Sequence, residues 1–367
     1  MMTPRERFLA QMRWEPVDRP PLMELGTWDT TEKVWREHTG LTHGELFAWE
    51  DDCDLKHRIE PDFAFRPAFE EQLVSEDETT FTKIDRMGLT YRQFKDNPDT
   101  SMPDYVGYPV KCRADWEALK VRLDPTDPAR YPADWDQLIA PMRDDGSIVC
   151  CYGLAENYYG GPSLFGFCRM LMGPEAMLYA VYDEPAMVED MMEYATEFAL
   201  TVLDKALAES PITYVQFWED MCYCSGPLLS PAMFKQFMVP RYQRITEKIR
   251  AAGIDTIFVD SDGDVSQLVP LWLESGINGL FPMEQASAHS DLRAYRKEYG
   301  KDLVILGGID KRVLAQDEAA IRAELEDKIP LAHEGGYIPT LDHWIPPDVT
   351  YDNFMIYWDL KKQMLGV

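Results

Sequence analysis

A repeated pattern from Ser147 onward constrains the fold: a short apolar run, a polar or acidic end, and then a helix pattern. The clearest copy is residues 255–264, in which an apolar run ends in two carboxylates and a glycine. Such a run is typical of a buried parallel strand that leads into a loop. Six of these units follow one another, with strands expected at residues 147–153, 213–217, 255–260, 279–284, 303–310 and 336–343.

A further short run at residues 22–25 reads as the first strand of the same series. Seven recognisable units, and no glycine-rich dinucleotide fingerprint after any strand, favour an α/β fold with a closed barrel over an open doubly wound sheet. We therefore predict a single domain, residues 1–367, with the (β/α)8 (TIM) barrel architecture.

Residues 50–115 interrupt this rhythm. Residues 79–84 alternate as a strand does, Met87 and Gly88 supply a turn, and residues 89–94 alternate again. Two alternating runs around a short turn predict a β-hairpin. We expect an N-terminal insertion at about residues 50–115 that contains this hairpin.

The charge excludes several classes of partner. The chain carries 64 acidic and 36 basic residues, a net charge of −28, which repels nucleic acids and suits polyanionic ligands poorly. No apolar run is long enough to cross a membrane, and residues 1–7 do not resemble a signal peptide. Seven cysteines without a regular framework favour free thiols, so we expect a cytoplasmic protein.

Acidic residues recur where the predicted strands end. In a barrel these ends meet at one mouth, which makes the residues there candidates for catalysis. A single acid in such a place is often a loop or helix cap, and Asp310 could simply pair with Lys311 and Arg312. Several acids on one rim need a proton, a cation or a metal in order to coexist. The catalytic candidates are His343, Asp260, Glu219 and Glu284, and the candidate metal ligands are Asp260, Asp262, His343 and Glu219.

His343 is the sharpest candidate, because it is titratable and follows Asp342, which could orient its ring. A structural histidine is the alternative. The pair Cys222 and Cys224 lacks the second pair that a zinc site needs, which favours ordinary thiols. Aromatic residues near the rim could line a pocket for a flat ligand; the candidates are Trp28, Tyr152, Tyr158, Tyr159, Trp218 and Phe281.

Five short segments together resemble the uroporphyrinogen decarboxylase superfamily: EPVDRP at 15–20, WEDM at 218–221, FPME at 281–284, GGID at 307–310 and GYIP at 336–339. The resemblance spans nearly the whole chain and is strongest at residues 214–353. It implies a (β/α)8 barrel. The superfamily contains decarboxylases and also methyltransferases that exchange methyl groups with a corrinoid cofactor.

Two departures from the family patterns limit which of these activities the resemblance implies. The arginine-rich signature that holds a porphyrinogen in the true decarboxylases has no counterpart at residues 22–28. The coenzyme M branch binds zinc through His-x-Cys after the fifth strand and Cys after the eighth, and this chain has Asp260, Asp262 and His343 at those positions. Both sulfur ligands are lost, while an oxygen and nitrogen site, with zinc as one candidate metal, stays open.

The resemblance then implies a methyltransferase of the O-demethylase kind. It would move a methyl group from a small, methoxylated aromatic donor to the cobalt of a separate corrinoid protein, because these 367 residues show no corrinoid-binding domain. The alternatives are a decarboxylase of a small carboxylic acid and a non-catalytic ligand-binding barrel. We expect no nucleic-acid or membrane partner, and a homodimer is one candidate assembly.

Overall fold

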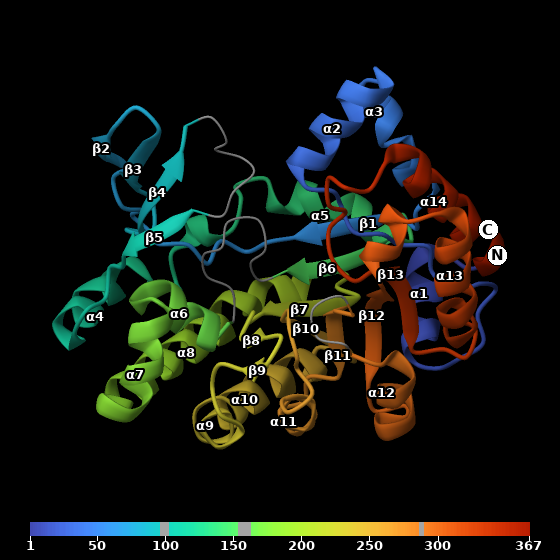
Figure 1. Cartoon of the computed structure of the whole chain (residues 1–367). Helices are drawn as coiled ribbons and strands as arrows, with labels where there is room; N and C mark the ends of the chain where they lie inside the picture. Colours follow the sequence, from blue (N-terminus) through green and yellow to red (C-terminus); the bar gives the residue numbers. More distant parts are fainter. Residues whose placement is uncertain (96–102, 153–162, 286–289) are drawn as a thin grey trace.

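The computed structural model describes residues 1–95, 103–152, 163–285 and 290–367. Its centre is a curled sheet of seven strands in the order β1-β6-β7-β10-β11-β12-β13, and every neighbouring pair is parallel (Figure 1). These strands are β1 Lys56–Ile59, β6 Ile148–Tyr152, β7 Tyr214–Trp218, β10 Thr256–Asp260, β11 Gly279–Met283, β12 Val304–Ile309 and β13 Tyr337–Leu341. The six strands predicted after Ser147 are confirmed.

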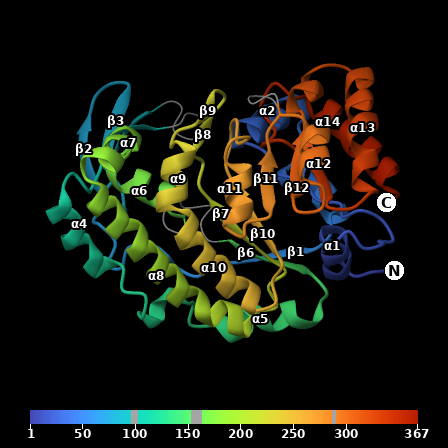
Figure 2. The same ribbon diagram turned by 90° about the horizontal axis from the view of Figure 1, so that it is seen from below.

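Most of the helices of the described residues lie on the outer face of this sheet, whereas the first one lies at its end (Figures 1 and 2). The helices are α1 Pro4–Met12, α2 Asp29–Thr39, α3 His43–Leu46, α4 Arg113–Leu119, α5 Trp135–Asp144, α6 Phe165–Met172, α7 Pro174–Asp183, α8 Pro185–Glu209, α9 Pro231–Phe237, α10 Val239–Ala251, α11 Val269–Glu274, α12 Leu292–Tyr299, α13 Glu318–Ala332 and α14 Tyr351–Leu365. Short 3₁₀ helices cover Ala48–Asp52, Lys120–Arg122, Pro128–Arg130 and Lys311–Ala315. In the described part of the chain, none of the helices has the length and apolar character of a membrane span.

Side chains alternate between the two faces of each strand, and they therefore pack into two separate hydrophobic cores. In β10, Ile257 and Val259 belong to the larger core with the helices, whereas Phe258 belongs to a smaller core inside the sheet. Phe8 and Met12 of α1 pack into that inner core beside Tyr214, Ile148 and Ile338. Since α1 also contacts the chain just before β6 and β13, it covers the amino-terminal end of the sheet. The opposite end is left for the site.

The first strand was predicted at residues 22–25, and this prediction is wrong. The segment lies beside β13 without a strand ladder, and an isolated bridge beyond its end joins Thr27 to Ile345. Side chains take the place of a backbone ladder here: Glu24 Oε1 accepts from Leu341 N (2.9 Å), and Asp54 Oδ2 accepts from Leu22 N (2.8 Å). The closed eight-stranded barrel is therefore not formed in full, and the described sheet has seven parallel strands.

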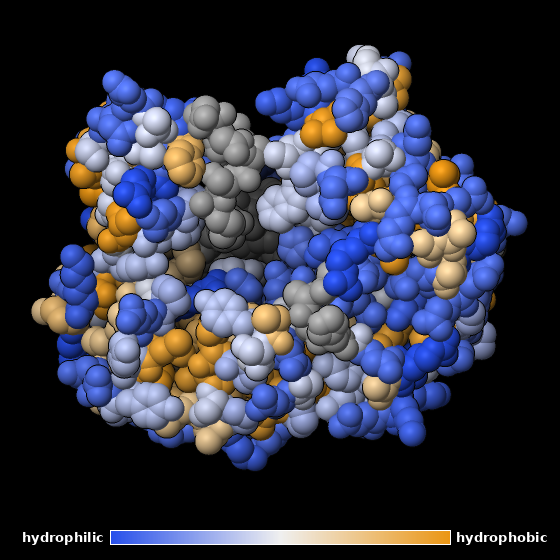
Figure 3. All heavy atoms as spheres, in the orientation of Figure 1, coloured by the Kyte–Doolittle hydropathy of each residue, from blue (hydrophilic) through white to orange (hydrophobic). Residues whose placement is uncertain are grey.

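Strand β1 lies instead at Lys56–Ile59, inside the segment predicted as an insertion. The part of residues 50–115 that stands apart from the main sheet is a four-stranded antiparallel sheet, of which β3 and β4 pair as the expected hairpin. Its strands are β2 Gln72–Glu76, β3 Thr80–Ile84, β4 Thr90–Phe94 and β5 Asp104–Gly107. A two-stranded sheet, β8 Cys222–Tyr223 with β9 Gly226–Pro227, completes the strands of the described residues. The surface is notched between the part with the small sheet and the part with α2 and α3 (Figure 3).

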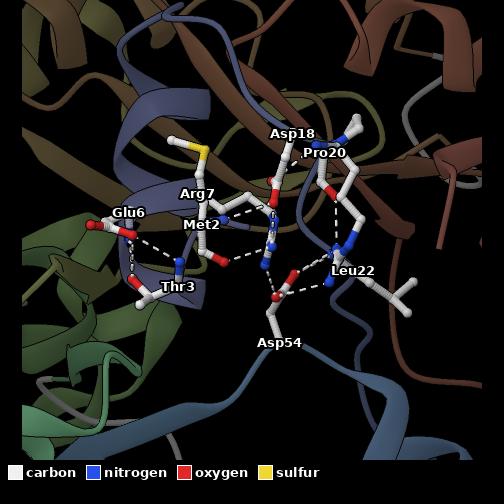
Figure 4. A network of polar contacts seen from close by, with 9 residues as sticks. Met2, Thr3, Glu6, Arg7, Asp18, Pro20, Leu22 and Asp54 are labelled. Atoms are coloured by element: carbon white, nitrogen blue, oxygen red, sulfur yellow. Dashed lines mark hydrogen bonds and ion pairs between the residues drawn. The ribbon is translucent and has the colours of Figure 1, made fainter.

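A buried ionic network fastens α1 to the start of β1 (Figure 4). Arg7, only 3% exposed, pairs with Asp54 and lies 2.8 Å from Asp18. Asp54, 2% exposed, also receives Arg19 at 2.9 Å. One carboxylate thus joins α1, the segment before residue 22 and β1.

Asp54→Ala is expected to lower the free energy of unfolding by about 3–5 kcal/mol, because it leaves two guanidinium groups and the Leu22 amide without their buried acceptor. Denaturant unfolding measures this. The exposed Asp51→Ala is the matched control and should change stability by less than about 0.5 kcal/mol. Equal losses in the two variants would contradict the role of Asp54.

Candidate active site

The site lies at the carboxyl ends of β7, β10, β11 and β13, where inward-facing side chains gather. Within β7 and β10, the alternation that puts Tyr214 and Phe258 in the inner core also turns Trp218 and Asp260 inward. Gln216 Nε2 donates to Asp260 Oδ2 (3.3 Å), and Phe281 of β11 packs against the inner core. Asp260 thus faces the interior, as predicted.

His343 and Asp262 come together at this mouth. His343 Nε2 lies 3.5 Å from Asp262 Oδ2, and the ring stacks on Trp28 with centroids 5.5 Å apart. His343 Nδ1 accepts the backbone N–H of Trp344 (2.8 Å), which places the proton of a neutral ring on Nε2. The histidine therefore presents a proton donor toward the carboxylate and the mouth.

Asp220 joins the same group, a role that sequence reasoning missed. Its carboxylate interacts electrostatically with Asp262 and His343, and Arg169 of α6 lies 3.1 Å from its Oδ2. Burial raises the pKa of Asp220 above its ordinary value; Arg169 opposes that rise, and the charge of Asp262 adds to it. Asp220 also has a φ of +40°, which is rare outside glycine and clusters at functional positions.

Asp262 has one carboxylate oxygen without a partner. In the described residues its Oδ1 is buried and accepts no hydrogen bond, while Oδ2 faces His343. A buried carboxylate oxygen left unsatisfied is costly unless a ligand supplies a donor. Asp220, Asp262 and His343, here called the mouth triad, can therefore hold or move a proton on a bound molecule.

Glu219 does not belong to the mouth, contrary to its prediction as a catalytic residue and metal ligand. Alternation turns it outward from β7, and it is fully buried. Its oxygens accept from Leu164 N (2.8 Å), Gly166 N (2.8 Å), Ser163 Oγ and Tyr242 Oη. Burial raises the pKa of Glu219, and these donors oppose the rise. Its role is to fix the start of α6.

Glu284 and Asp342 also hold loops. Glu284 Oε2 accepts from Gly263 N (2.9 Å), which positions the loop that carries Asp262, and Lys311 Nζ lies 3.4 Å from Oε1. Asp342 accepts from Gln285 N and Lys311 N, so the prediction that it orients His343 is wrong. Asp310 pairs with Arg312, as the sequence suggested.

The predicted metal set does not fit the geometry. Among the described residues, no group of three or more His, Cys, Asp and Glu is arranged to hold a metal ion. The physical reason lies with Glu219, whose oxygens are already occupied by donors of the chain itself.

The predicted aromatic lining is found in part. Trp28 stacks on His343, Trp218 lies 4.9 Å from the guanidinium of Arg169, and Phe281 is half-buried inside the sheet. Tyr152 is the last residue of β6. Tyr158 and Tyr159 lie outside the described residues.

Two cations on β1 were missed altogether. Lys56 and Arg58 are in register with Ile148 and Cys150, which belong to the inner core, so both side chains start from the inner face. Of the four residues of β1, Lys-His-Arg-Ile, only the isoleucine is apolar, so the sequence pattern did not predict a strand there.

The titration of Asp220 gives a prediction with a definite sign. Its raised pKa means that the folded chain keeps a proton that the unfolded chain has released, so stability falls as pH rises through the window above the usual value of about 3.9. Asp220→Asn, which tolerates positive φ, should remove this decline in the free energy of unfolding.

Asp310→Asn provides the control of opposite sign. Burial raises the pKa of Asp310, but its hydrogen bonds with Arg312 outweigh that and lower it. The native residue therefore loses stability as pH falls, and the variant should lack that loss. Denaturant titrations from about pH 3 to pH 7 test both variants; equal pH profiles for Asp220→Asn and the native chain would contradict the assignment.

Comparison with known proteins agrees with this architecture. The uroporphyrinogen decarboxylase (URO-D) family model matches residues 160–364, more than half of the chain. Uroporphyrinogen decarboxylases from Gloeobacter violaceus and an Anaeromyxobacter species are 23% and 24% identical to it, over 98% and 93% of both chains.

A solved structure described as a methyltransferase from Methanosarcina mazei is 17% identical, covers 99% of both chains and superposes with a TM-score of 0.60, which indicates a shared fold. The resemblance predicted from the sequence is confirmed by the family match. The chain belongs to the uroporphyrinogen decarboxylase family.

Proposed function

We propose that this chain is a methyltransferase that removes a methyl group from a small methoxylated aromatic compound. The observation that carries the proposal is His343, whose Nε2 faces Asp262 at a mouth walled by Trp28. The fold shared with a methyltransferase is consistent with it. The acids around the mouth suit a substrate with eight carboxylates poorly, which counts against the activity for which the curated relatives are named.

The mouth triad has a defined task in this reaction. When the bond between the methyl carbon and the ether oxygen breaks, the electron pair stays on the oxygen, where negative charge develops. His343 can donate a hydrogen bond from its Nε2–H to that oxygen and so stabilise the developing charge, while its Nδ1 continues to accept the N–H of Trp344. Asp220 lies within electrostatic reach of both His343 and Asp262. Trp28 and Trp218 offer flat faces for the aromatic ring.

In this proposal the methyl group is accepted by the cobalt of a corrinoid, which supplies the nucleophile and is carried by a separate protein. This chain contributes the orientation of the donor and a hydrogen bond to the leaving oxygen, and the partner would approach the face at the carboxyl ends of the strands. Homodimer formation and a cytoplasmic location stay predictions.

A second candidate is a decarboxylase of a small carboxylic acid. The observation that favours it is Arg169, a cation beside Asp220 at the mouth that could bind a carboxylate. In that reaction the carbon–carbon bond to the carboxylate breaks, carbon dioxide leaves, and the carbon left behind takes up a proton from solvent. Release of carbon dioxide without methyl transfer would favour this candidate.

The test is incubation of the purified chain with reduced corrinoid protein and a panel of methoxyarenes. Formation of methylated cobalt, read from its visible spectrum, supports the methyltransferase. His343→Leu is expected to lower the rate by about 10²-fold or more, because the hydrogen bond that stabilises charge on the leaving oxygen is lost. His333→Leu, at an exposed histidine at the end of α13, is the matched control and should retain the rate.

Two results would contradict the proposal. One is the absence of methylated cobalt with every donor while ligand binding persists, which would favour a non-catalytic ligand-binding barrel. The other is equal activity of His343→Leu and the native chain, which would remove the role of the mouth triad.

A further inference from the structure

The guanidinium of Arg169, on α6, uses only one of its edges within the described residues. Nη1 donates to the backbone oxygen of Asp220 (2.7 Å) and to its Oδ2 (3.2 Å), and Nη2 donates to the same Oδ2 (3.1 Å). The two terminal nitrogens therefore meet Asp220 end-on. The neighbouring edge, made of Nε–H and the second N–H of Nη2, has no acceptor in the part of the chain that the structure describes.

Two contacts fix the plane of this guanidinium. Asp220 holds its end, and the ring of Trp218 lies 4.9 Å from it in a cation–π contact. Trp218 is in turn packed against Gly166 of α6, where a Cβ atom would come within 3.1 Å of its Cζ3. The unused edge is therefore held in one orientation before a ligand arrives, which lowers the entropic cost of binding.

Arg169 lies at the mouth and is partly enclosed there. Trp218 ends β7 and Asp220 follows it, and the carboxylate of Asp220 interacts electrostatically with His343 and Asp262. The side chain of Arg169 is 16% exposed, so a ligand can reach it from solvent. Arg169 and His343, the histidine of the proposed reaction, thus interact with the same aspartate.

Two parallel N–H groups on one planar edge match the two oxygens of a carboxylate. The pair with Asp220 does not prevent such binding, because a guanidinium has five N–H donors and can serve two carboxylates. Arg66 does so within this chain: its Nε donates to Asp127 (2.9 Å), and its Nη1 donates to Asp62 (2.8 Å). The free edge of Arg169 therefore has the geometry to bind one more carboxylate.

We propose that the free edge of Arg169 binds a carboxylate of the substrate, which makes Arg169 a residue that determines specificity. The inference rests on the proposed function for the methyl donor, and it narrows that donor to a methoxylated aromatic carboxylate. A single ring that carries both groups can direct its carboxylate to Arg169 and its methoxy oxygen to His343, since both residues interact with Asp220. Neutral methoxyarenes lack this contact and should bind more weakly.

Equilibrium binding tests this role without any corrinoid partner. Calorimetry compares meta- and para-methoxybenzoate with the corresponding methoxybenzamides, which have nearly the same shape and no charge. The native chain is expected to bind the better acid at least about tenfold more tightly than its amide, because the amide cannot form the charge-assisted pair of hydrogen bonds. Arg169→Met should abolish that preference, and Arg169→Lys, which keeps the charge without the planar edge, should retain only part of it.

Two further variants separate the edge of Arg169 from the charge of Asp220. Arg169→Met leaves the Asp220 carboxylate uncovered, and that charge repels an acid by itself. Arg169→Met combined with Asp220→Asn should still lack the preference, whereas Asp220→Asn alone should retain it. A preference restored in the double variant would assign the effect to Asp220 and overturn the proposal. Arg113→Met, at an exposed arginine of α4 that also pairs with an acid, is the matched control and should leave the preference unchanged.

The outcomes separate this inference from the proposed function. Equal or absent binding of acid and amide by the native chain, or an undiminished preference in Arg169→Met, overturns the carboxylate site. A clear preference that depends on Arg169, in a chain that forms no methylated cobalt, keeps the carboxylate site and removes the methyltransferase. Methylated cobalt formed from neutral methoxyarenes, without any preference for the acids, does the reverse. Should Arg169→Met fail to fold by circular dichroism, Arg169→Gln replaces it with the same expected loss.

Discussion

The arrangement of this molecule depends on buried carboxylates that accept backbone N–H groups where strands end or are missing. Such groups must be satisfied once they leave water. Glu219 serves the start of α6, Asp342 serves the turns after β11 and β12, and Glu24 serves the last residue of β13. The same device at Asp54 joins α1 to β1. Part of the strongly acidic composition is therefore structural.

Acids on one rim have different roles because only some of them accept hydrogen bonds from the backbone. Carboxylates whose oxygens are used by the chain hold loops in place, and those loops present the remaining acids. Glu284 illustrates the link, since it binds Gly263 N and thereby fixes the loop of Asp262. The mouth triad can still bind a ligand, because Asp262 retains a buried oxygen without a hydrogen-bond partner in the described part of the chain.

The sequence by itself determined the parallel strands after Ser147 and the acids at their ends, because apolar runs and turn residues are local signals. It also placed Asp260 on the inner face, which follows from alternation within one strand. It could not identify β1, whose inner face is charged, or reject residues 22–25, whose ladder is replaced by distant carboxylates. Only the tertiary structure decided which acids are used up by backbone amides and which meet His343, since those partners are far apart in the chain.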